Sequence, residues 1–119
     1  MSYQDLNSVS LIGRLTRDSE LKFTPSGTPV INFSIANNKP KKKVGDSYED
    51  QPANFFNIVM WGKMAESLIQ YLKKGSQVGV SGKLQHRTWE KDDGQKMSIV
   101  EVIADSVQLI GGKSDGGGI

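Results

Sequence analysis

Apolar and polar side chains alternate with a period of two along five segments of the chain, which is the pattern of half-buried β-strands. In the first segment Leu11 and Leu15 share one face, while Arg14 takes the other. In the second segment Ile31 and Phe33 alternate with polar neighbours in the same way. The predicted strands are residues 9–17, 30–37, 55–61, 77–89 and 97–109, with residues 21–23 continuing the first strand after a bend.

The period changes between the third and fourth of these segments. Ala65, Leu68 and Leu72 repeat at helical spacing within residues 62–74. Gly75 follows two lysines, and this arrangement suits a helix C-terminus because glycine accepts a left-handed backbone and cations favour the negative end of the helix dipole. We therefore predict one helix over residues 62–74.

The connections carry turn-forming residues. Residues 25–27, Pro-Ser-Gly, predict a tight turn, and Asp93 with Gly94 predicts a hairpin between the last two strands. Residues 38–54 are polar and contain two prolines, so they form either a long mobile loop or a protruding hairpin.

Three strands, one helix and two further strands follow in this order. The order predicts an all-β fold with one helix, namely a five-stranded Greek-key oligonucleotide-binding (OB) barrel with the helix between strands 3 and 4. Other small barrels and α+β folds share the same count of elements. We expect residues 1–110 to form one domain and residues 111–119, GGKSDGGGI, to form a flexible tail.

The third strand has large apolar side chains on both of its faces. Phe56, Ile58 and Met60 form the more uniformly apolar set, so we place them in the core. Phe55 and Trp61 then stand on the outer face of the barrel. Two more aromatic residues are expected in the core: Phe23 and Phe33.

In the fourth predicted strand, apolar and polar residues divide between the two faces more clearly than in the third. Val78, Val80 and Leu84 form the apolar set, whereas Trp89 falls in the polar set beside Arg87. Unpaired bases stack on exposed aromatic rings that are interleaved with cations, and the cations meet the phosphates. Taken singly, a strand aromatic residue is usually core, and a lysine run is usually solvated surface; the combination indicates nucleic-acid binding.

Composition narrows the function classes. The chain has 119 residues, no cysteine and a formal net charge of +2. His86 is the one histidine, so nucleophilic triads and histidine or thiolate metal sites are nearly impossible to build. Glu101 and Asp105 are expected to be solvated surface, and no phosphate-binding loop motif occurs. We expect neither an enzyme nor a cofactor.

Targeting signals are also absent from the sequence. No segment approaches the roughly 20 apolar residues that span a bilayer. The first ten residues lack the charged and then apolar pattern of a signal peptide. The expected location is therefore the cytoplasm, with no membrane partner.

Three separated blocks closely resemble the bacterial and phage single-stranded DNA-binding proteins, between about Asn7 and Ile110. The blocks are LIGRLTRDSELKFTPSGTPVINFSIA, FNIVMWGKMAESLIQYLKKGSQVGVSGKL and RTWEKDDGQK. The resemblance implies an OB fold, usually a homotetramer, that binds single-stranded DNA without sequence preference in replication, recombination and repair. It also implies association with the nucleoid, or the host cytoplasm if the protein is phage-encoded.

The resemblance assigns roles to individual positions. Base stacking is implied for Phe55, Trp61 and Trp89, which are the three aromatic residues singled out by strand parity. Phosphate contacts are implied for a basic set: Lys63, Lys74 and Arg87, with Arg14 and Lys22 as additions.

Two departures from the family pattern matter. A stacking tryptophan often found at the start of the long loop is replaced by the KPKKK run, including Lys41 and Lys43, which suggests electrostatics in place of stacking. The chain also stops at Ile119 without the acidic, aromatic tip that recruits repair and replication proteins. Partners that depend on that tip are therefore not carried over. Two alternatives stay open: an OB-type protein-interaction module and a single-stranded RNA binder.

Overall fold

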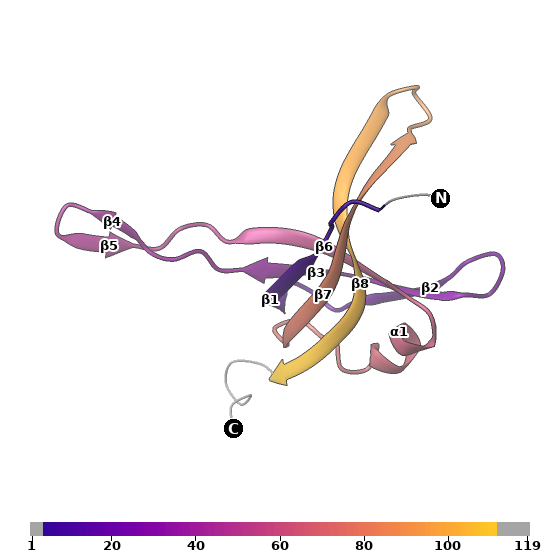
Figure 1. The fold of residues 1–119 in the computed structure, drawn as a ribbon, viewed down its shortest axis with the longest axis horizontal. Helices are drawn as coiled ribbons and strands as arrows, with labels where there is room; N and C mark the ends of the chain where they lie inside the picture. Colours follow the sequence, from indigo (N-terminus) through magenta and orange to yellow (C-terminus); the bar gives the residue numbers. More distant parts are fainter. Residues whose placement is uncertain (1–3, 112–119) are drawn as a thin grey trace.

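The computed structural model describes residues 4–111 and contains all five predicted strands (Figure 1). In chain order the elements are β1 (Val9–Leu15), β2 (Glu20–Phe23), β3 (Pro29–Asn37), β4 (Lys42–Val44), β5 (Ser47–Glu49), β6 (Asn54–Trp61), α1 (Lys63–Leu68), β7 (Gln77–Glu90) and β8 (Lys96–Gly111). Gly111, the first residue of the predicted tail, is the last residue of β8, and residues 112–119 lie outside the described residues.

Five of the strands close into a ring. The main sheet runs β1-β7-β8-β6-β3-β2, and a further pairing between β1 and β3, through Arg14–Ala36 and Leu15–Ile35, closes the ring and leaves β2 outside it. The β6–β8 pairing is parallel, and the other pairings of this sheet are antiparallel. With α1 between β6 and β7, this topology confirms the predicted Greek-key OB barrel.

The core fills the inside of this ring. Ile31, Phe33 and Ile35 alternate along β3 and are at most 4% exposed, while Ile58 and Met60 face them from β6. Of the interior set predicted for the third strand, Ile58 and Met60 are buried, and Phe56 packs partly buried against the core. The core is completed by Leu15, Ala65, Leu72, Val78, Val80, Val102 and Ala104.

Two glycines allow strands to approach closely where the sheet bends. A Cβ on Gly82 would lie 2.1 Å from the Ile103 carbonyl oxygen, next to a register shift between β7 and β8. A Cβ on Gly13 would lie 2.7 Å from the Ala36 carbonyl oxygen, where β1 meets β3. Barrel closure therefore depends on the missing side chains at these two positions.

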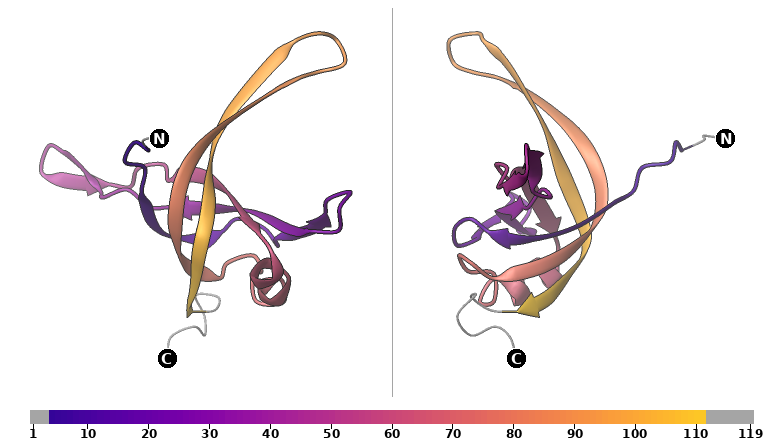
Figure 2. Two further views of the ribbon diagram at one scale, coloured as in Figure 1. Left: turned by 45° about the vertical axis from the view of Figure 1, so that its right-hand side comes forward. Right: turned by 90° about the vertical axis from the view of Figure 1, so that its left-hand side faces the viewer.

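Two hairpins project from the ring in different directions (Figures 1 and 2). The β4–β5 hairpin lies within residues 38–54, so the hairpin alternative predicted for this segment is the one that forms. The β7–β8 hairpin extends past the barrel, and beyond Gly82 every residue of β7 is exposed. Leu84, predicted with the apolar set of its strand, is consequently 45% exposed.

Three further expectations are wrong. Phe23 is 57% exposed because β2 extends past the core at the β2–β3 turn. The first strand ends at Leu15, and the segment predicted to continue it is the separate strand β2, paired with β3. The helix covers only Lys63–Leu68; single-turn bonds, such as Tyr71 N–H to the Leu68 carbonyl, continue after it.

Candidate nucleic-acid interface

The strand register places the predicted aromatic residues on one side of the sheet. Phe55 and Trp61 pair with Ala36 and Val30, on the opposite side of β3 from its buried residues. They are 66% and 51% exposed, and they lie six positions apart along the strand, a distance of about 20 Å. Both side chains stand outward, as the strand parity predicted.

The same face continues across β8 to β7. Val59 of β6 pairs with Ile103, which pairs with Lys83 of β7. From Gly82 to Glu90 the β7–β8 register is unbroken, so Arg87 and Trp89 share the side of Lys83. Trp89 is 39% exposed. One continuous sheet face therefore carries all three predicted stacking residues.

Two predicted cations join this face through the register. Arg14 lies in one cross-strand row with Ala36 and Phe55, and its Nη1 donates to the Gly75 carbonyl at 2.8 Å. Lys22 lies in one row with Val30 and Trp61; its Nζ is 3.9 Å from Glu20 in an exposed pair. Such exposed pairs are weak, so Lys22 remains available to an anionic ligand.

The remaining lysines lie around the face. Lys63 is the first residue of α1, two residues after Trp61, and Lys74 is exposed where the chain leads into β7. Lys43 lies on β4, and Lys41 immediately precedes that strand, with its Nζ 3.8 Å from Asp50 Oδ1. These two lie on the β4–β5 hairpin, which leaves the barrel at the Phe55 end of β6 (Figure 1).

Sequence reasoning missed an ion pair with a buried carboxylate on this same face. Glu101, expected at the solvated surface, is only 7% exposed, and its Oε1 accepts a hydrogen bond from Arg87 Nε at 3.0 Å. The Arg87 guanidinium carbon also lies 4.8 Å from the centroid of the Trp89 ring. The signal in the sequence was the place of Glu101 between apolar residues of the fifth predicted strand.

A small cavity opens beside this pair. It measures about 140 Å³ and is lined by polar and apolar groups, including Arg17, Asn57, Arg87 and Glu101. Its position between β6, β8 and the β1–β2 connection puts it on the face that carries the aromatic residues.

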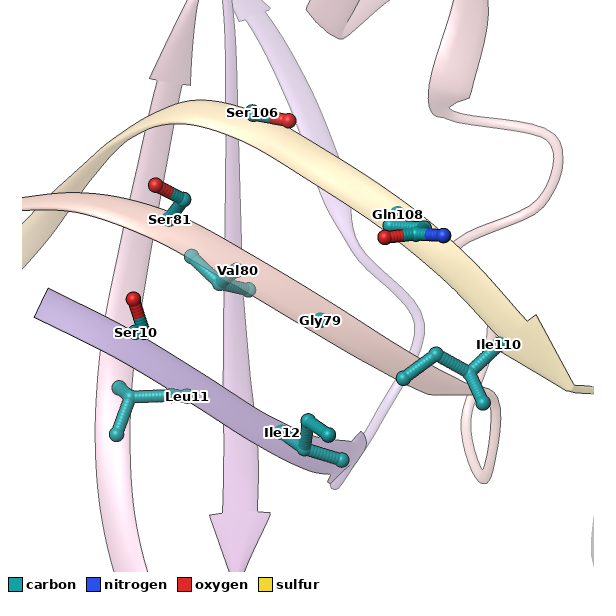
Figure 3. A pocket seen from close by; sticks show the side chains of 9 residues that line it. All are labelled: Ser10, Leu11, Ile12, Gly79, Val80, Ser81, Ser106, Gln108 and Ile110. Carbon is teal, nitrogen blue, oxygen red and sulfur yellow. The ribbon is translucent and has the colours of Figure 1, made fainter.

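A larger cavity lies elsewhere, against β1, β7 and β8 (Figure 3). It measures about 500 Å³. None of the residues predicted to bind DNA lines it, and its lining is uncharged: Ser10, Leu11, Ile12, Gly79, Val80, Ser81, Ser106, Gln108 and Ile110. The chemistry expected for nucleic-acid binding is therefore not found in this cavity.

Residues 4–111 hold no cluster of three His, Cys, Asp or Glu side chains that could bind a metal ion. Within the same range no helix is long and apolar enough to cross a membrane.

Comparison with known proteins matches residues 6–110 to the Single-strand binding protein family. The chain belongs to this family. A single-stranded DNA-binding protein of Oceanobacillus iheyensis is 47% identical over 113 residues, which cover 95% of this chain and 68% of that protein. One of Treponema pallidum is 49% identical over 107 residues, which cover 90% of this chain and 59% of that protein.

The fold agrees with that of a solved family structure. A Plasmodium falciparum SSB complex with ssDNA superposes with a TM-score of 0.79 at 28% identity, covering 92% of this chain and 98% of that one. The chain thus has the family's barrel over nearly its whole described length. It spans about two thirds or less of the length of the two bacterial relatives.

Proposed function

We propose that this chain binds single-stranded DNA without sequence preference. The observation that carries the proposal is the continuous sheet face on which exposed Phe55, Trp61 and Trp89 alternate with cations. Membership of the Single-strand binding protein family, and relatives named single-stranded DNA-binding proteins, support the same assignment.

Each part of the face contributes in a different way. Every base has a π-face, so stacking on an aromatic ring contributes about 1–3 kcal/mol per base and tolerates any sequence. Lysine and arginine neutralise phosphates and release counterions, which makes the affinity depend on salt. Stacking residues spaced by about 20 Å along β6 require an extended strand rather than a single nucleotide.

The proposed role is protection of unpaired DNA during replication, recombination and repair, by binding and without catalysis. Residues 1–110 would act as one binding domain in the cytoplasm, associated with the nucleoid.

Self-association into a homotetramer is part of the proposal. Ile12 and Ile110 are 54% and 47% exposed and line the uncharged cavity on β1, β7 and β8. An exposed apolar face without charge is typical of a contact surface. None of the residues predicted to bind DNA lines this cavity, so a second copy bound there would not cover them directly.

Competition binding tests the proposed function. Labelled oligo-dT at low salt should be displaced by unlabelled single-stranded DNA of any sequence, and only poorly by duplex DNA. A preference for single-stranded RNA would assign the face to RNA. Absence of binding to any nucleic acid by a folded protein would contradict the proposal and favour a protein-interaction module.

A further inference from the structure

Glu101 carries a negative charge on a face where repulsion of a bound polyanion would disfavour one. Its side chain lies on the same sheet face as Phe55, Arg87 and Trp89, where a polyanion is proposed to bind. It is 7% exposed, and burial of a charged group is costly unless the group is paired. A negative charge under the path of the DNA would also repel phosphate, so its presence calls for a compensating function.

The partner of Glu101 is a residue of the proposed binding surface. Glu101 Oε1 accepts from Arg87 Nε at 3.0 Å, while the Arg87 side chain remains 51% exposed. The guanidinium carbon lies 4.8 Å from the centroid of the Trp89 ring. Within residues 4–111 the Nη groups of Arg87 donate no hydrogen bond, so their donors are free for a ligand.

We propose that Glu101 is a positioning residue for DNA binding: it fixes Arg87 against Trp89, so that the free guanidinium donors meet the phosphate of the nucleotide stacked on that ring. The inference rests on the proposed function of the face. It assigns a role to a residue that does not itself touch DNA.

The physical reason is the flexibility of the arginine side chain. An unrestrained arginine loses rotamer entropy when it is immobilised. In the unbound protein the bond to Glu101 and the contact with Trp89 already hold the guanidinium, so binding immobilises less. A guanidinium with Nε engaged still presents its Nη donors to a phosphate.

The substitution Glu101→Gln separates this role from simple charge. If Glu101 acts only as a negative charge near DNA, its removal strengthens binding. If it positions Arg87, affinity for oligo-dT falls by about five- to tenfold, because the neutral Gln amide oxygen holds the guanidinium more weakly than the carboxylate does. The slope of log affinity against log salt should also become shallower by about 0.7, the value for one phosphate on a single strand.

Glu90→Gln is the matched control. Glu90 is an exposed carboxylate of the same strand, directly after Trp89, and it forms no ion pair within residues 4–111. Its removal should leave binding unchanged or slightly stronger. Equal strengthening by Glu90→Gln and Glu101→Gln would overturn the positioning role.

An Arg87→Ala background gives a second, independent test. There Glu101 has lost its partner, so Glu101→Gln should raise affinity instead of lowering it. The same substitution thus has opposite signs in the two backgrounds. If it lowers affinity in both, Glu101 acts through something other than Arg87, and the inference is wrong.

Folding is checked by thermal unfolding of each variant. Should Glu101→Gln fail to fold, Arg87→Lys replaces it: the charge stays but the fork that bonds Glu101 is lost. If Glu101 positions Arg87, Arg87→Lys should lower the affinity for oligo-dT by a similar five- to tenfold. Wild-type affinity in this variant would contradict the inference. Absence of oligo-dT binding by the wild-type protein would instead contradict the proposed function itself.

Discussion

Single residues decide where the binding face lies. Phe55, Trp61 and Trp89 keep large ring surfaces in water, although burial of such rings is the usual source of stability. Phe33, an equally apolar side chain on the neighbouring strand β3, is 4% exposed. The contrast follows from side-chain parity within the strands, and the exposed rings are the stacking surfaces of the proposed DNA face.

Truncating two of the rings should weaken DNA binding strongly. Phe55→Ala with Trp89→Ala removes two stacking surfaces, each worth about 1–3 kcal/mol per base. We expect a loss of at least tenfold in affinity for oligo-dT, measured by fluorescence anisotropy. Phe23→Ala is the control, because Phe23 is similarly exposed but belongs to the opposite side of β2. Wild-type affinity in the double variant would contradict the stacking assignment.

Two glycines of β7 should differ in their tolerance of a methyl group. Gly82→Ala places a Cβ against the Ile103 backbone, which cannot move as a flexible side chain does. We expect a destabilisation of about 1–3 kcal/mol in denaturant unfolding, the usual cost of overpacking. At Gly79 the nearest atom is the Ile110 Cδ1 at 3.6 Å, so Gly79→Ala should be nearly neutral. Equal effects at both positions would argue against a close crossing at Gly82.

At the scale of elements, the alternation of apolar and polar residues predicts strands well where a strand borders the core. It fails where a strand continues past the core, because neither face is then buried. Leu84 and Phe23 show this: each has the parity of the interior, and each lies beyond the end of the barrel. The strands were therefore predictable from sequence, but the exposure of their outer ends was not.

The helix and the ion pair show two other limits. Helical spacing of Leu68 and Leu72 is compatible with one helix, yet the chain leaves the helix at Leu68 and still buries Leu72 completely. Glu101 and Arg87 are fourteen residues apart in sequence. Their contact requires the β7–β8 pairing, which local pattern does not specify.

The β4–β5 hairpin makes a separate prediction about salt. Its lysines precede or lie on β4 with little beyond exposed ion pairs to hold them, so they are free to follow the DNA backbone. Replacing Lys41, Lys42 and Lys43 with glutamine should reduce the salt slope by about 0.7 for each phosphate contact that is lost.

Acidic residues of the same hairpin are the control for that variant. Asp46→Asn with Glu49→Gln changes charge in the other direction and should leave the slope equal or steeper. A lysine variant with an unaltered slope would place the hairpin outside the DNA path.

The whole molecule presents two faces of different character. The net charge of +2 does not reveal this difference: Arg14, Lys22 and Arg87 lie on the side of the aromatic residues, whereas the cavity lining on β1, β7 and β8 is uncharged. One face therefore suits a polyanion, and the other suits a second protein surface.

Assembly on the uncharged face should be measurable without DNA. Light scattering should give a mass of about four times the 13.1 kDa of one chain, as expected for a homotetramer. Ile12→Glu should lower that mass, because a charge at an apolar contact is costly, whereas Phe55→Ala should leave it unchanged. A single-chain mass for the wild-type protein would contradict assembly.

Intrinsic tryptophan fluorescence during titration with oligo-dT, at low and at high salt, tests the central claim most directly. Trp61 and Trp89 are the two tryptophans, and both lie exposed on the proposed DNA face. We predict strong quenching at low salt that weakens as salt rises, because bases cover the rings while phosphates release counterions. A folded protein whose fluorescence stays constant at both salt concentrations would contradict the claim that this face binds single-stranded DNA.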